Sequence, residues 1–298
     1  MPIRPVLMLR SWLLLCLVMF SQQVYAQEDR AFFWRLSKGD TQAYLMGSVH
    51  FADQSFYPLR EVIEQAYDAS THLVVEVDVS NMDHAEFQRL MISRGIYKDG
   101  TDLRQVLSEE TWLQLRQRLK TLDIDYENVK HYKPGMLVLM LTSAHVIRMG
   151  FAPDLGIDMY FLKRANADAN KQVIELETTE QQMNLFLNIP DAELLLKESL
   201  YSLDESELLM AEMVRYWKTG DDENMNRLLF EDALEEYPNF TAIYDELFYR
   251  RNETMTSKIV DLIANNGVYF IVVGSGHLIG DRGIVSDLKK LGYKVERL

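Results

Sequence analysis

The chain is poor in cysteine and has no long apolar run. Cys16 is the only cysteine among 298 residues, and it lies inside an N-terminal apolar run, so the remainder can form neither a disulfide nor a thiolate nucleophile. That run, Trp12–Phe20, has nine residues, whereas a helix that spans a bilayer needs about 20. The sequence therefore argues against a disulfide-stabilised fold, a cysteine hydrolase and a stable membrane anchor.

Positive charge is also scarce. The chain has 31 Lys and Arg against 45 Asp and Glu, which gives a formal net charge of −14. This balance argues against nucleic acid or an anionic membrane as a partner, because both are polyanions.

The His-Glu-x-x-His motif is missing as well, which excludes a zincin. Apolar residues make up 48% of the chain, enough to bury a sizeable core.

The N-terminus has the pattern of a secretory signal. Arg4 and Arg10 precede the apolar run, and Val24-Tyr25-Ala26 follows it as a cleavage site with a small residue at its end. We expect residues 1–26 to be a signal peptide and the protein to be periplasmic or secreted. A lipid anchor on Cys16 is disfavoured, because Leu15 stands where such a site needs a small residue.

Hydrophobic periodicity predicts an α/β or α+β fold for residues 27–298, taken as one domain. Short apolar runs bounded by turn residues predict strands at 31–39, 41–47, 72–79, 171–177, 267–274 and 292–298. Apolar residues spaced by three and four predict helices at 58–69, 83–94, 108–122, 134–149, 154–169 and 190–218, and over most of 221–266. We therefore expect a central mixed sheet, built from the N- and C-terminal segments, with a helical insertion at about 83–150 and 185–265.

Two Gly-Ser-x-His motifs each follow a predicted strand. They comprise Gly47, Ser48 and His50, and Gly274, Ser275, Gly276 and His277. Glycine permits the chain to turn sharply after a strand, which holds the histidine on a short loop at the sheet edge where α/β proteins bind ligands. Each histidine could instead be a turn residue bonded to nearby backbone. Because the motif occurs twice, we favour two imidazoles that point into one pocket.

Two carboxylates occupy comparable positions. Glu76 lies within the predicted strand 72–79, and Glu177 ends the predicted strand 171–177. A carboxylate in an apolar strand is costly to bury unless it is paired or binds a cation. The alternative to a functional role is a structural salt bridge with an arginine such as Arg251. Asp78 and Glu175 are each two residues from one of these carboxylates, and either could substitute for it or support it.

Five segments give the chain a strong resemblance to the GumN/TraB family of bacterial proteins. They are 44–59, 73–80, 155–182, 250–255 and 269–298. The family is related to the Tiki proteins, which are metal-dependent peptidases, and more distantly resembles erythromycin esterases and the ChaN haem-binding proteins. The resemblance implies a fold like that of these last two groups. It also implies a cleft around paired Gly-x-x-His motifs and glutamates.

Carried over by position, the catalytic and metal-ligating residues would be His50, Glu76, Glu177 and His277, with Arg251 and Asn252 nearby. Two imidazoles with one or two carboxylates can hold Mn, Co or Zn with an open position, and such an ion activates bound water. The resemblance thus implies a metal-dependent hydrolase of a peptide or small molecule. The alternatives are a non-catalytic ligand- or haem-binding protein and a metal-free, esterase-like hydrolase. The oligomeric state stays open.

The signal peptide gives the first testable prediction. Cleavage after Ala26 would leave Gln27 as the first residue of the exported protein. Mass spectrometry of protein purified from cells should find that N-terminus. A retained Met1, or a lipid attached to Cys16, would contradict the prediction.

Overall fold

The structure is a computed structural model, and it describes residues 30–39, 41–189, 191–204 and 206–298. The predicted signal peptide at 1–26 lies outside the described residues. Within the described part of the chain, every helix is too short or too polar to cross a lipid bilayer.

A six-stranded sheet forms the centre of the molecule and confirms the predicted α/β class. Its strands are β1 (Phe33–Lys38), β2 (Thr41–Ser48), β3 (His72–Val75), β4 (Gln172–Glu175), β5 (Tyr269–Gly274) and β6 (Lys294–Arg297), in the order β4-β3-β5-β2-β1-β6. β1 is antiparallel to both of its neighbours, whereas β2, β5, β3 and β4 are mutually parallel. The sheet is therefore mixed and draws on both ends of the chain, as predicted.

Two predicted strands end earlier than the sequence suggests. β3 ends at Val75, so Glu76 lies just beyond it rather than within it, and Glu177 lies two residues beyond the end of β4. Backbone hydrogen bonds nevertheless continue the pairing, from Leu176 N–H to Val75 O at 2.8 Å and from Glu177 N–H to Glu76 O at 2.8 Å. This continued pairing holds the two glutamates side by side where the sheet ends.

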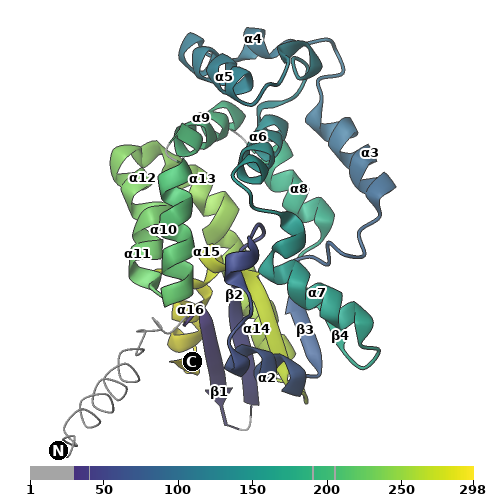
Figure 1. Cartoon of the computed structure of the whole chain (residues 1–298), viewed down its shortest axis with the longest axis vertical. Helices are drawn as coiled ribbons and strands as arrows, with labels where there is room; N and C mark the ends of the chain where they lie inside the picture. Colours follow the sequence, from purple (N-terminus) through teal and green to yellow (C-terminus); the bar gives the residue numbers. More distant parts are fainter. Residues whose placement is uncertain (1–29, 40, 190, 205) are drawn as a thin grey trace, which may run out of the picture.

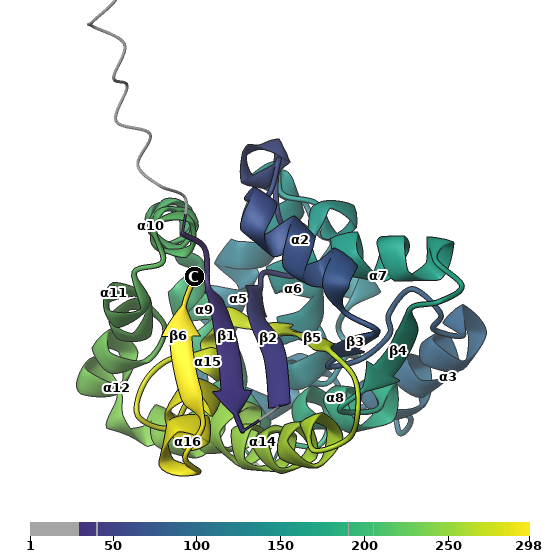
Figure 2. The same cartoon turned by 90° about the horizontal axis from the view of Figure 1, so that it is seen from below.

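Helices cover both faces of the sheet. Figure 2 shows α2 (Glu61–Ala69) and α7 (Ile157–Ala167) on one face, and α14 (Arg250–Ile263) and α16 (Ile284–Lys290) on the other. Each helix buries an apolar stripe. In α14 the buried residues Met255, Ile259 and Ile263 recur every four residues, which places them on one side of the helix.

α15 (Ser275–Leu278) follows β5 directly. The other helices gather beyond the carboxyl ends of the parallel strands (Figure 1). They are α3 (His84–Gly95), α4 (Leu103–Val106), α5 (Glu109–Thr121), α6 (Pro134–Arg148), α8 (Thr179–Leu187), α9 (Ala192–Asp204), α10 (Ser206–Thr219), α11 (Asp222–Asn226), α12 (Asp232–Glu236) and α13 (Thr241–Tyr244). The predicted insertion ranges 83–150 and 185–265 contain most of this helical layer. The assignment of 27–298 to a single domain stays a prediction.

Two π-helical segments interrupt the helical layer. They are η4 (Arg227–Glu231), between α11 and α12, and η6 (Asp245–Tyr249), between α13 and α14. A π-turn adds one residue to a helical turn and so rotates the side chains that follow it, and such turns are frequent at functional sites.

Phe270 of β5 joins the sheet to the helices that cover it. Its side chain is fully buried, and its ring centroid lies 5.9 Å from that of Phe33, 5.5 Å from that of Tyr67 in α2 and 4.7 Å from that of Phe161 in α7. One side chain thus packs against a second strand and against both helices on that face.

We expect Phe270→Ala to lower the free energy of unfolding by about 3–5 kcal/mol, because it removes a fully buried aromatic ring and leaves a cavity. Ile92→Ala is a suitable control, since Ile92 is 60% exposed and its truncation should change stability by less than about 0.5 kcal/mol. Urea denaturation of both variants checks the difference. Equal stability of the two would show that the core is not organised around this ring.

Candidate active site

The two Gly-Ser-x-His motifs meet at one edge of the sheet. His50 lies on a loop as predicted, whereas Ser275 and His277 belong to the short helix α15, which starts directly after β5, so the predicted loop is wrong for the second motif. β2 and β5 are adjacent and parallel, and Ser48 pairs with Gly274, so both motifs leave the sheet at the same level. The Ser275 hydroxyl donates to Ser48 O at 2.9 Å and joins the two motifs directly. The register of two strands from opposite ends of the chain therefore brings the motifs together.

Close packing accounts for the glycines of the motifs. A Cβ on Gly47 would lie 2.7 Å from the Cβ of Phe32 and 2.8 Å from the Ser275 hydroxyl, too close for any side chain. A Cβ on Gly274 would lie 3.3 Å from Glu76 Oε1, 3.5 Å from His277 Cδ2 and 4.0 Å from His50 Nε2. Gly274 is therefore the point on which the predicted site residues converge.

His277 is buried and held in one orientation. Its Nδ1 lies 2.6 Å from Asn252 Oδ1, and the Asn252 amide donates through Nδ2 to Arg282 O at 2.8 Å, which fixes the direction of that amide. Nδ1 must then carry the proton, so Nε2 has a free lone pair. Burial lowers the pKa of His277 to about 4, and the ring is neutral at pH 7. Asn252, predicted to lie near the site, thus sets the tautomer of the histidine.

His50 has a different environment. Its side chain is 60% exposed, and its Nδ1 lies 3.0 Å from Asp158 Oδ2. The Asp158 carboxylate raises the pKa of His50 above its ordinary value of 6.5. In both imidazoles an oxygen atom lies within hydrogen-bond distance of Nδ1, so that Nε2 is the nitrogen left for a ligand. This arrangement is typical of metal-ligating histidines.

Asp158 is a site residue that no sequence motif indicated. It stands in the first turn of α7, which begins beside His50: Ile157 N–H donates to Val49 O at 3.0 Å, and a Cβ on Gly156 would lie 2.5 Å from His50 O. An aspartate in the first turn of a helix is common for electrostatic reasons alone. Asp158 lies in the segment 155–182, which resembles the GumN/TraB family, and this was the one hint of a functional role. The sequence did not show that this segment contacts His50.

Arg251 joins the two glutamates. Its Nη2 donates to Glu76 Oε2 at 2.7 Å and to Glu177 Oε2 at 2.6 Å, and its Nε donates to Glu177 Oε1 at 2.9 Å. Gln182 donates to both carboxylates as well, at 2.9 and 3.1 Å. The structural salt bridge considered as an alternative is thus present, and it lies within the site.

Glu76 is ionised despite its burial. Burial alone would raise its pKa. The charge that His277 acquires in acid, Arg251, His50 and the Gly274 N–H, which donates to Glu76 Oε1 at 2.7 Å, outweigh this effect and lower the pKa to about 2. Glu76 Oε1 also lies 3.9 Å from His277 Nε2. The site therefore combines one fixed carboxylate with two oriented imidazoles.

The fit of these residues to a metal ion is partial. Among the described residues, no three or more His, Cys, Asp or Glu side chains are arranged to hold an ion as they stand. His50, His277 and Glu76 line the same pocket and are of the types that hold such an ion: His277 through Nε2, Glu76 through a carboxylate oxygen, and His50 through Nε2 once its ring is deprotonated. Both oxygens of Glu177 accept hydrogen bonds from Arg251, so Glu177 is placed to support Arg251 rather than to complete the donor set.

These residues form the floor of a pocket of about 510 Å³, within the range of small-molecule sites. The floor contains residues of both motifs together with Glu76, Arg251 and Gln182. The side of the pocket comes from the helical layer and is mainly apolar. We call it the apolar wall, and it consists of Leu139, Val146, Met183, Leu185, Phe186, Met210, Met213, Leu229, Leu247 and Phe248.

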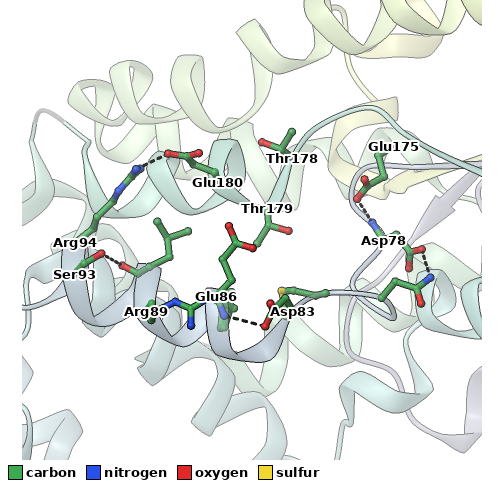
Figure 3. Close-up of a pocket in the computed structure, with 14 residues that line it drawn as sticks. Asp78, Asp83, Glu86, Arg89, Ser93, Arg94, Glu175, Thr178, Thr179 and Glu180 are labelled. Carbon is green, nitrogen blue, oxygen red and sulfur yellow. Dashed lines mark hydrogen bonds and ion pairs between the residues drawn. The ribbon is translucent and has the colours of Figure 1, made fainter.

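A second pocket, of about 810 Å³, contains the two carboxylates considered as substitutes. Figure 3 shows Asp78 and Glu175 on its lining, where Glu175 Oε1 accepts from the Asp78 backbone N–H at 2.7 Å. The other lining groups include Asp83, Glu86 and the ion pair of Arg94 with Glu180. No histidine lines this pocket, so Asp78 and Glu175 do not join the imidazoles.

The fold and the site together define an α/β protein with paired Gly-x-x-His motifs around a buried carboxylate. The chain belongs to the TraB/PrgY/gumN family, whose model matches residues 32–297, and the predicted family is thereby confirmed. The predicted likeness to erythromycin esterases and ChaN proteins stays a prediction.

Relatives among known proteins agree with this assignment. The chain is 25% identical to YbaP of Escherichia coli (strain K12) over 252 residues, which cover 84% of this chain and 89% of YbaP. It is 24% identical to the metalloprotease TIKI2 of Xenopus tropicalis over 332 aligned positions, which cover 91% of this chain but 60% of TIKI2. The metalloprotease TIKI1 of the same species is 23% identical over 89% of this chain and 61% of its own length. No solved structure matches the chain.

The contact between Asp158 and His50 leads to a prediction about the pKa of His50. In protein treated with a chelator, Asp158→Asn should lower the pKa of His50 towards 6.5, because it removes the carboxylate that favours the imidazolium. Since this pKa is raised in the folded state, the pair stabilises the fold most below pH 6.5, and the effect disappears as the pH rises through the folded-state pKa.

NMR titration of the imidazole resonances measures the shift. Asp154→Asn is the matched control, because Asp154 precedes α7 by three residues and pairs with Lys163 at the surface. An unchanged His50 pKa in Asp158→Asn would show that the carboxylate does not act on this ring.

Proposed function

We propose that the protein is a metal-dependent hydrolase of the peptidase type that acts in the periplasm or outside the cell. The observation that carries the proposal is the pair of imidazoles, each held at Nδ1 by an oxygen, that line one pocket beside ionised Glu76. The relatives named metalloproteases support a hydrolytic reaction. The signal-like segment 1–26 supports export.

Each residue of the site has a distinct task in this proposal. His50, His277 and Glu76 would hold a divalent ion such as Mn, Co or Zn. When bound, such an ion lowers the pKa of a water towards about 7 and polarises a carbonyl group. Asn252 leaves the lone pair of His277 on Nε2, and Asp158 holds His50 at Nδ1, so that His50 would present Nε2 to an ion once its imidazolium proton is lost. Arg251 balances the charge of Glu76 and of Glu177.

One observation favours a second candidate, a metal-free hydrolase. Arg251 already balances the two glutamates, so the buried carboxylates need no metal ion to be stable. Neutral His277 would then accept a proton from water through its free Nε2. The oriented imidazole and the same peptide or small-molecule substrate serve either reaction.

Chelation and metal addition distinguish the two candidates. Purified protein should cleave members of a peptide library. A chelator should abolish that cleavage, and Mn, Co or Zn should restore it. Cleavage that persists after complete metal removal, checked by elemental analysis, would contradict the metal-dependent reaction and support the metal-free one.

His50→Ala and His277→Ala should each lower kcat/KM by about 100-fold or more, because each removes a group that acts on the reacting atoms. His84→Ala is the control, since His84 is exposed in the first turn of α3. Thermal melting of every variant shows whether the fold survives. If both site variants unfold while His84→Ala stays folded, the two histidines are structural and the proposal loses its main support.

A further inference from the structure

Several side chains of the apolar wall are only partly buried, although they pack beside the core. Met183, Phe186, Met210, Met213, Leu229 and Leu247 are all partly exposed, although each is apolar, and all line the same pocket. They come from α8, α10, η4 and η6, which are far apart in sequence. Apolar surface gathered in a pocket from several elements marks a binding site.

The apolar wall has no positive charge to offer a ligand. Arg251 is the one Lys or Arg among the described lining residues, and its guanidinium is already bound by Glu76 and Glu177. A carboxylate or phosphate on a ligand would lose its hydration against the apolar wall without gaining a partner. The wall therefore suits an uncharged, apolar group.

The apolar wall reaches the reacting groups through Phe248. Its ring centroid lies 5.3 Å from that of His277 and 4.9 Å from that of Phe230, so the π-helical segments η4 and η6 pack against each other beside the motif. A Cβ on Gly276 would lie 3.0 Å from Phe248 Cε1, which explains the glycine in Gly-Ser-Gly-His. An apolar group on the wall would thus lie next to the bond that is broken.

We propose that the apolar wall is the specificity pocket for a large apolar side chain, such as Leu, Met or Phe, of a peptide substrate next to its scissile bond. The inference rests on the proposed hydrolase function and adds the substrate class. Met183, Met210 and Met213 favour several such side chains over a single one, because methionine is unbranched and adapts its shape to its neighbours.

A peptide series tests the preference. The peptides are acetyl-Ala-Ala-X-Ala-Ala-amide, with Leu, Met, Phe, Ala, Asp or Lys at X, and mass spectrometry locates each cleaved bond. We expect cleavage on one side of X and a kcat/KM for Leu, Met and Phe at least about tenfold above that for Ala, Asp and Lys. Equal rates across the series would overturn the inference and leave the hydrolase function standing.

Two variants of α10 test the wall itself. Met213→Asp should remove most of the preference for apolar X, whereas Met213→Leu should keep it. Leu208→Asp is the matched control on the same helix, because Leu208 is 68% exposed and does not line the pocket. Melting curves verify the fold. If Met213→Asp unfolds, Met210→Asp on the same wall replaces it. A folded Met213→Asp or Met210→Asp with unchanged preference would contradict the inference.

Binding separates the two proposals. In His277→Ala, which cannot catalyse the proposed reaction, calorimetry should still show tighter binding of the Leu, Met and Phe peptides than of the Asp and Lys peptides. Apolar binding without cleavage by the unaltered protein would support the pocket and overturn the hydrolase function. If all peptides bind with equal affinity, the proposed specificity for apolar side chains is wrong, whether or not the protein cleaves peptides.

Discussion

The bridge from Arg251 to Glu76 and Glu177 is the interaction on which the site depends. The side chains are 14%, 7% and 10% exposed, so two neighbouring carboxylates are held almost without water. Without the guanidinium they would repel each other, and loss of one member of such a buried ion pair typically costs about 3–5 kcal/mol. The bridge fixes α14 against the ends of β3 and β4. Because Asn252 is the next residue, the same helical turn also orients His277.

The two histidines are matched in geometry and opposed in charge. Burial keeps His277 neutral, whereas the Asp158 carboxylate favours the protonated form of the exposed His50. The two rings differ in charge because different helices lie against them. α14 lies against His277, whereas α7 begins beside His50. A repeated sequence motif therefore does not imply two equivalent groups, and its two copies can divide a reaction between them.

Most of the fold could be predicted from the sequence, because periodicity shows which residues are buried and the terminal strands are strongly apolar. The convergence of the motifs was also accessible, since glycines after two strands suggest a common edge. What could not be predicted depends on contacts between distant segments. Asp158 reaches His50 because of where α7 starts, and Phe248 reaches His277 because a π-turn rotates its helix. The ends of β3 and β4 were overestimated because backbone pairing continues past them, to Glu76 and Glu177.

The pairing of β2 with β5 also governs when the pocket can exist. Ser48 and Ser275 are 227 residues apart in sequence, and strand pairing and the Ser275–Ser48 bond hold the two motifs together. Bringing such distant segments together requires closure of a long loop, which costs conformational entropy and slows folding. A chain in which β5 is missing or unpaired therefore has neither the second motif nor the floor of the pocket.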